Sequence, residues 1–104
     1  MKHIHYMDED AEDMSEAGAK GVKLRTVLGE KDRVPNFYMR TISFGQGGRS
    51  PNHSHDYEHE LFVINGSGTA EVDGESIHLK PGDVMYIPAN VNHCFRTTES
   101  MEFL

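Results

Sequence analysis

The chain has 104 residues, of which 37% are hydrophobic and 26% are charged, and its formal net charge is -7 at pH 7. This balance predicts one soluble globular domain with a modest core. The negative charge argues against nucleic-acid binding, because phosphate contacts need clustered Lys and Arg, and no basic amphipathic stretch suits an anionic membrane. We therefore expect neither nucleic acid nor a membrane as a partner.

Much of the negative charge lies near the start of the chain. We interpret residues 1–21 as a solvated acidic segment that precedes a barrel domain at 22–104, with a cation-binding tail as the alternative. Helix is scarce, since only residues 8–17 could form a short turn or two, which Gly18 and Gly21 would end.

No stretch resembles the apolar part of a signal peptide, and none approaches the about 20 apolar residues that span a bilayer. Cys94 is the only cysteine, so an internal disulfide is ruled out, which agrees with a reducing compartment. We therefore expect a cytoplasmic protein. Cys94 follows His93 and faces the other side of a strand, and we interpret it as a buried, unreactive thiol.

From residue 22 onward, short β-rich runs alternate with turn residues, which is the pattern of an all-β sandwich or barrel. The first two runs are joined through a turn at Pro35 and Asn36. The dipeptides Asn65-Gly66 and Asp73-Gly74 favour tight hairpins, so the runs around them predict a meander of antiparallel strands. The predicted strands are 22–28, 37–44, 61–64, 69–72, 76–79, 84–87, 93–97 and 101–104.

Four of the seven histidines form a constellation that points to a metal. His53 and His55 are two residues apart, so in extended chain they share a face at about 6.5 to 7 Å. Two imidazoles at that spacing can converge on one ion at about 2 Å each. His59 begins the next strand, and the turn and strand at 82–88 can return His93 beside the first pair. We therefore predict one divalent transition metal per chain.

Two motifs resemble those of the cupin superfamily, in the spacing found in small single-domain bacterial members. They are Gly47-x5-His53-x-His55-x3-His59-Glu60-x5-Gly66 and Gly82-x5-Pro88-x4-His93. The resemblance covers most of the chain after Val22 and implies an antiparallel double-stranded β-helix, the jelly-roll barrel. It also favours Mn or Fe as the metal, although imidazole ligands are equally compatible with Zn, Ni, Co or Cu.

The chain departs from the cupin pattern at three positions. Asn90 stands where the family usually has Gly, and it tolerates the left-handed conformation that Gly supplies. Thr97 replaces a usual Asn. The third departure matters most for the site, because His59 stands where the family usually has a glutamate ligand.

The choice of fourth ligand lies between His59 and Glu60. Adjacent strand residues point to opposite faces, so the two cannot both coordinate. Apolar periodicity does not decide between them, because all four residues at 61–64 are apolar. The run resembles a cupin subgroup in which a third histidine replaces the glutamate, and we therefore favour His59 and keep Glu60 as the alternative.

Three further residues are candidates for lining a pocket: Arg40, Phe95 and Phe103. Phe95 shares the face of His93, whereas an outward-pointing Arg40 is the favoured interpretation of that charge. Phe103 is equally compatible with ordinary core. We interpret the remaining histidines as having no part in the site, and these are His3, His5 and His78.

Four neutral imidazoles would leave the charge of the metal uncompensated, which favours an anionic chelator as a small-molecule ligand. The leading hypothesis is a dioxygenase-type oxidoreductase acting on a small organic molecule. The alternatives are a metal-dependent isomerase or lyase acting on a sugar or keto acid, and a non-catalytic ligand-binding or sensor module. The implied fold hosts all three.

We also predict a homodimer. Apolar residues occupy both faces of 37–44 and 61–64, which is more apolar surface than one small core can bury.

Overall fold

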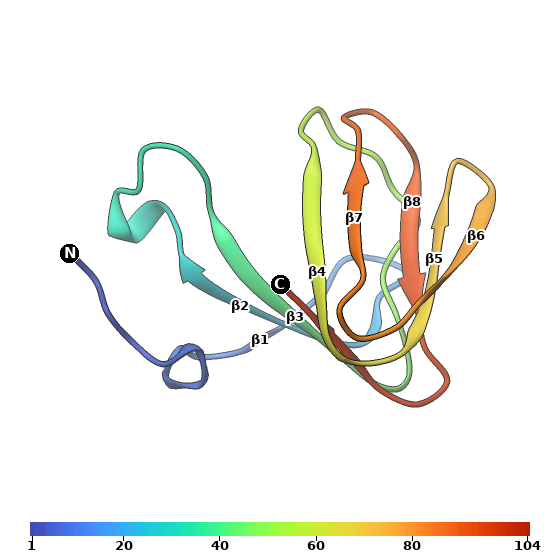
Figure 1. Cartoon of the computed structure of the whole chain (residues 1–104), viewed down its shortest axis with the longest axis horizontal. Coiled ribbons are helices and arrows are strands. Elements are labelled where there is room, and N and C mark those ends of the chain that lie inside the picture. The colour runs from blue at the N-terminus through green and yellow to red at the C-terminus, as the bar shows by residue number, and fades with distance from the viewer.

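The computed structural model describes residues 1–104 as an all-β chain without an α-helix (Figure 1). Two single turns of 3-10 helix are present, η1 (Tyr6–Asp8) and η2 (Glu30–Asp32). No helix is long or apolar enough to cross a membrane. The strands are β1 (Glu12–Asp13), β2 (Lys20–Leu28), β3 (Met39–Arg49), β4 (His59–Gly66), β5 (Gly68–Val72), β6 (Glu75–Leu79), β7 (Val84–Ile87), β8 (His93–Arg96) and β9 (Met101–Phe103).

The strands form one antiparallel sheet whose order along the main path is β6-β5-β8-β3-β9-β4-β7, with β2 paired to β3 and β1 to β2. The sheet curls, and β4 to β8 lie together on the right of Figure 1, where they form the body of the barrel. This arrangement confirms the predicted jelly-roll barrel. Every strand expected between residues 22 and 104 is present, with only its ends displaced by a few residues.

The predicted meander is wrong at its first hairpin. β4 pairs with β7 and β9, whereas β5 pairs with β6 and β8, so the chain crosses over at Gly66 instead of turning back. Gly66 serves a close approach, because a Cβ there would lie 2.1 Å from the carbonyl oxygen of Ser100. The second hairpin is confirmed, since Asp73 and Gly74 have φ of 51° and 81° between β5 and β6.

The core lies between the curled halves of the sheet and decides which face of β4 is interior. Leu61 and Val63 are 7% and 0% exposed, whereas Phe62 and Ile64 are 47% and 38% exposed. Because side chains alternate along a strand, every odd-numbered residue of this run faces inward. The buried core residues are Val22, Phe44, Leu61, Val63, Ala70, Leu79, Ile87, Phe95, Met101 and Phe103.

β2 and β3 form a long hairpin that projects from the barrel, and the N-terminal segment lies along it (Figure 1). The predicted helical turns over residues 8–17 are wrong, apart from the residue where η1 ends. β1 instead pairs with β2, in the register Glu12 with Leu24 and Asp13 with Lys23. This segment has few apolar residues among its acidic ones, so a helix here would have no apolar face to bury.

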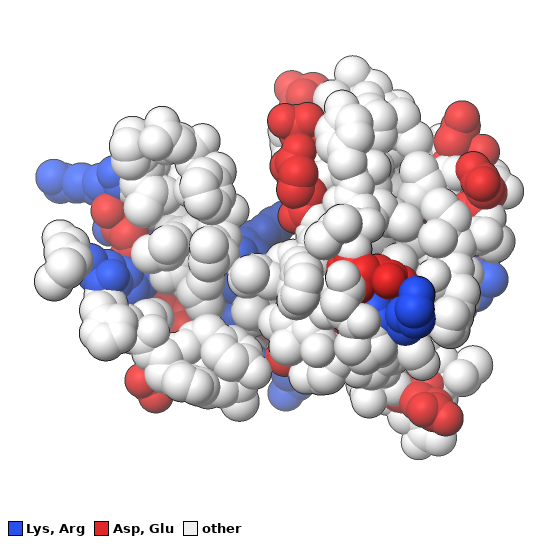
Figure 2. Space-filling view, viewed as in Figure 1, with Lys and Arg blue, Asp and Glu red and all other residues white.

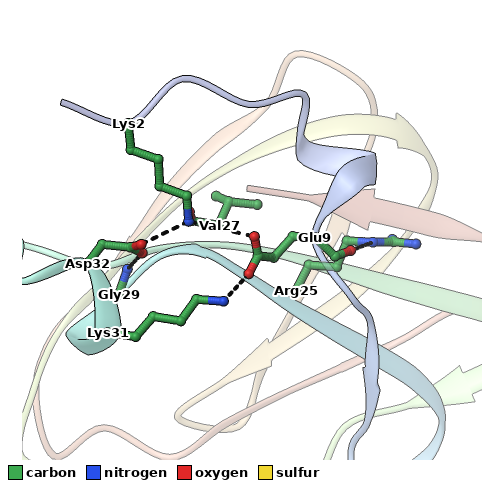
Figure 3. A network of polar contacts seen from close by, with 7 residues as sticks. All are labelled: Lys2, Glu9, Arg25, Val27, Gly29, Lys31 and Asp32. Atoms are coloured by element: carbon green, nitrogen blue, oxygen red, sulfur yellow. Dashed lines mark hydrogen bonds and ion pairs between the residues drawn. The ribbon is translucent and has the colours of Figure 1, made fainter.

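The N-terminal segment is also more than a solvated tail, because charged residues fasten it to the hairpin (Figure 3). The Lys2 ammonium donates to Asp32 Oδ1 at 2.9 Å and to the Val27 carbonyl at 3.0 Å. Glu9 pairs with Lys31, and the carbonyl of Glu9 accepts from Arg25 Nε at 3.1 Å. Within the acidic run, Glu9 is therefore the residue that is neutralised, by Lys2 and by Lys31.

Candidate metal centre

Backbone hydrogen bonds hold the histidine loops together. His53 and His93 form an isolated antiparallel bridge, with N–H···O distances of 3.1 and 2.9 Å. The Asn90 amide donates to the carbonyl of His55 at 2.7 Å. Asn90 has φ of 67°, as its place in the second motif led us to expect. Hydrogen bonds between backbone atoms thus fix the segments that carry His53, His55 and His93 relative to one another.

Three histidines converge at one point: His53, His55 and His93. One ligand nitrogen from each lies within 4.8 Å of the other two. The ring centroids are 5.3 Å apart for His53 and His55, 4.9 Å for His53 and His93, and 5.0 Å for His55 and His93. This cluster indicates a site for a divalent metal ion.

Hydrogen bonds at Nδ1 leave the Nε2 atoms of these rings free. The Nδ1 of His55 lies 2.8 Å from the Tyr57 carbonyl, and that of His93 lies 3.0 Å from the Val91 carbonyl. A carbonyl only accepts, so each Nδ1 must carry the proton and donate. Each Nε2 then keeps its lone pair, which is the arrangement that metal-binding histidines adopt.

The donor set passes a direct test of fit to a metal. His55 Nε2 is buried without any hydrogen-bond partner, which is costly unless the nitrogen has a ligand. His93 is 2% exposed, and burial lowers the pKa of its imidazole, so the ring is neutral at pH 7 and available as a donor. A divalent cation satisfies both requirements.

His59 lies beside this trio but is not part of its tightest grouping. It projects inward from β4, on the face that carries Leu61, and its ring centroid is 4.5 Å from His55 and 5.3 Å from His93. Burial first, and then the charges of the neighbouring histidines and Arg40, together lower the pKa of His59 to about 4. The ring is therefore neutral and turned toward the same cavity.

Glu60 faces the opposite side of β4. It is exposed, stands opposite Tyr86 on β7, and does not line the cavity. Partial burial, and secondarily the charge of Glu58, raise the pKa of its carboxyl. Figure 2 shows acidic side chains over β4 where it faces the β2–β3 hairpin, and a basic group deeper in the hollow between hairpin and barrel.

The histidines line a cavity of about 190 Å³, which is large enough for a small organic molecule. Phe95 and Phe103 lie on its wall as well as in the core. Arg40 also lines it, so the favoured outward-pointing interpretation of that residue is wrong. Arg40 shares a face of β3 with Ile42 and Phe44, which line the same cavity, because alternate residues of a strand point to the same side. The full lining is Met14, Glu16, Arg40, Ile42, Phe44, Ser50, His53, His55, Tyr57, His59, His93, Phe95 and Phe103.

Sequence reasoning missed six of the lining residues, which are Met14, Glu16, Ile42, Phe44, Ser50 and Tyr57. The Tyr57 ring stacks on His55 with centroids 3.8 Å apart and an interplanar angle of 7°. Its position two residues after His55 was a usable signal for a shared face. Met14 and Glu16 reach the cavity from the N-terminal segment, and nothing in their local sequence indicates it.

The residues expected outside the site are outside it. His3, His5 and His78 are exposed. Cys94 needs a correction, since it is half-buried and lies 3.8 Å from a Glu71 oxygen instead of being enclosed. Burial, together with the Glu71 charge, raises the pKa of its thiol, so low reactivity still follows.

The fold and the histidine cluster define a class of small β-barrel proteins built around one metal-binding pocket. Residues 40–104 match the family described as the cupin domain. The polyketide cyclase RemF from Streptomyces resistomycificus is 30% identical and superimposes with a TM-score of 0.93, over 99% of this chain and 75% of that chain. The chain therefore belongs to the cupin family.

Two curated relatives are oxygenases. Quercetin 2,3-dioxygenase of Bacillus subtilis is 34% identical over 69% of this chain and 22% of its own length. Acireductone dioxygenase of Bacillus cytotoxicus is 27% identical over 73% of this chain and 45% of its own length. This chain thus spans less than half the length of these two relatives.

Proposed function

We propose that this cupin binds one divalent transition metal through His53, His55, His59 and His93, with Mn or Fe favoured, and acts on a small organic molecule that carries a keto–enol group. The observation that carries the proposal is the buried, unpartnered Nε2 of His55 beside two other converging imidazoles. The inward orientation of His59 and the outward orientation of Glu60 support histidine as the fourth ligand.

The relatives support the substrate class. Quercetin, acireductones and polyketides all carry carbonyl and enol oxygens close enough together for both to bind one cation. A metal in the cavity would act as a Lewis acid toward two such oxygens. The chain would supply the remaining contacts, with Arg40 attracting an enolate by charge and the rings of Phe95 and Phe103 packing on the carbon skeleton.

The proposed reaction is of the dioxygenase type, and it is tested by oxygen uptake. Metal-loaded protein would be given quercetin or another keto–enol compound in an oxygen-electrode cell, and we expect uptake that depends on both metal and substrate. The matched control is His78→Ala, an exposed histidine that should behave as wild type, whereas His55→Ala should be inactive. Binding of the compound without any turnover would contradict an enzymatic role.

A second candidate is a non-oxidative reaction, such as cyclisation or isomerisation of the same class of compound. It is favoured by the cyclase from Streptomyces resistomycificus, whose likeness extends over 99% of this chain. Strict anaerobiosis separates the two candidates. Turnover that persists without oxygen, and is still abolished by His55→Ala, would replace the dioxygenase proposal with this one.

We also propose that the protein is a homodimer through the outer face of β4 and β7. Phe62, Val84 and Tyr86 are 47%, 75% and 59% exposed, and Phe62 stands opposite Val84 across the two strands. β7 ends the sheet, so a second copy can approach this face without obstruction. Light scattering should give a dimer for wild type and a monomer for Val84→Lys, and a monomeric wild type at micromolar concentration would contradict the proposal.

A further inference from the structure

Glu16 links the N-terminal segment to the histidine cluster. Its carboxylate oxygens lie 3.1 and 3.3 Å from His53 Nδ1, although the two residues are 37 positions apart in the chain. Glu16 lies outside the range 40–104 that matches the cupin domain. It reaches the cavity because the Met14 amide donates to the Val22 carbonyl at 3.0 Å and the Ala19 amide closes a turn on the Glu16 carbonyl at 3.0 Å.

His53 differs from the other two clustered histidines in the group that orients it. The Nδ1 atoms of His55 and His93 donate to backbone carbonyls, which are neutral and fixed by the fold. His53 Nδ1 instead faces a carboxylate on a different segment, so its orienting group can be removed without disturbing the barrel. A carboxylate that accepts the Nδ1 proton also makes Nε2 a stronger donor to a metal.

The charge of Glu16 matters because the proposed ligands are all neutral. An ion held by four imidazoles keeps its full double charge, and Glu16 places one negative charge a single ring away from it. The Glu16 side chain is 53% exposed, so its contact with His53 can break and reform in solution. A bound cation would strengthen the contact, because it favours the His53 tautomer that donates to Glu16.

We propose that Glu16 is a positioning residue for the metal, and that metal binding and docking of residues 14–19 on the cavity mouth stabilise each other. This inference rests on the proposed metal site. Thermodynamic linkage makes the coupling reciprocal, so that whatever docking contributes to metal affinity, the metal contributes equally to docking.

The test compares Glu16→Gln with Glu12→Gln in the full chain. Both changes remove one negative charge from the same segment, but Glu12 is exposed and lies on β1. For Zn²⁺ measured against a competing chelator, we expect Glu16→Gln to lose about 10-fold or more in affinity, the range seen when groups that orient metal-binding histidines are removed. Glu12→Gln should stay within about twofold of wild type, because screened surface charge acts weakly at a distance.

Two readouts separate an effect on the metal from one on structure. The visible spectrum of the Co²⁺-loaded protein should shift in Glu16→Gln and not in Glu12→Gln. Zn²⁺ should slow hydrogen exchange of the Met14 and Ala19 amides in wild type, and should lose this effect in Glu16→Gln. Unchanged affinity and spectrum in Glu16→Gln would overturn the inference while leaving the metal site intact. A wild-type protein that binds neither ion would overturn both.

Discussion

The two sides of the cavity are held in different ways. On the barrel side, His53 and His93 share two backbone hydrogen bonds, and His55 is anchored by the Asn90 amide. On the other side, Glu16 and Arg40 come from the N-terminal segment and the projecting hairpin. These are joined to each other by the short pairing of β1 with β2 and by ion pairs, such as the one between Glu9 and Lys31.

The difference indicates that the two regions have different roles at the cavity. Backbone bonds between strands are kept whatever the side chains do, so the ligand geometry belongs to the barrel. On the opposite side, β1 pairs over only two residues, and ion pairs that reach solvent contribute little each and are screened by salt, so this wall is easier to move. We infer that the barrel side sets the geometry of the metal ligands. The side formed by the N-terminal segment and the hairpin sets the charge around the metal and the access to it.

The largest effect that the comparison predicts is the loss of metal from the barrel side. His93→Ala removes a donor that is 2% exposed and one of the three converging imidazoles, so metal content by elemental analysis should fall to near zero. His78→Ala, which changes an exposed histidine on β6, should keep wild-type content. Full metal content in His93→Ala would show that the ion binds elsewhere.

The next effect tests whether the barrel side is the rigid one. Gly66→Ala should destabilise the protein by about 3 kcal/mol, because the added Cβ would meet the Ser100 carbonyl and the residue has positive φ. Gly74→Ala also has positive φ but meets nothing within 4 Å, so about 1 kcal/mol is expected. Denaturant melts of both variants give the comparison, and equal losses would mean that the crossover at Gly66 can relax.

The strands could be predicted from the sequence because their signals are local, whereas the jelly-roll order of the strands followed from the resemblance to the cupin superfamily. Strand 69–72 alternates polar and apolar residues between two Gly-containing turns, strand 84–87 follows the turn at Gly82, and both appear with nearly the expected ends. The Asn65-Gly66 signal was misleading because glycine serves two purposes. It permits tight turns, but here it permits the approach of Ser100, and only the tertiary structure distinguishes these uses.

The candidate site was predictable in part for the same reason. His53, His55 and His93 follow from motif spacing, whereas the face of His59 depends on which side of β4 meets the core. The apolar run at 61–64 hides that choice, and burial of Leu61 and Val63 resolves it. Glu16 could not be predicted as a site residue, because a contact across 37 residues produces no periodic pattern in the sequence of the N-terminal segment.

A smaller effect concerns the charge of the ligand set. If His59 is the fourth ligand, the change His59→Glu would cancel one unit of charge at the ion and weaken binding of a dianion such as oxalate. We expect a several-fold loss by titration of the metal-loaded proteins at matched salt. Glu60→Ala, on the outer face of the same strand, should bind oxalate as wild type does. Tighter oxalate binding by His59→Glu than by wild type would show that His59 is not the fourth ligand.

The smallest effect lies in the polar network that fastens the N-terminal segment (Figure 3). A hydrogen bond from Lys31 lowers the pKa of the Glu9 carboxyl below its ordinary 4.5, and the Gly29 amide, followed by Lys2, lowers that of Asp32 below 3.8. A carboxyl whose pKa is depressed in the folded protein stabilises it above the unfolded value, and the stabilisation is lost as pH falls through the folded value. The network should therefore hold at pH 7, weaken below about pH 4.5 and be lost in stronger acid.

The Gly29 amide reports this directly, because it donates to Asp32 Oδ2 at 2.9 Å. Its NMR chemical shift, followed from pH 7 downward, should titrate with a midpoint below 3.8, the ordinary value for an aspartate. In Lys31→Gln the midpoint of the Glu9 carboxyl signal should rise toward 4.5, because the donor that depresses its pKa is gone. The barrel amides of Ser50 and Thr97 should not move over the same range, since they donate to the carbonyls of Phe95 and Gly48. If they shifted together with Gly29, the two sides of the cavity would loosen as one unit, and the division between a fixed barrel and an adjustable hairpin would not hold.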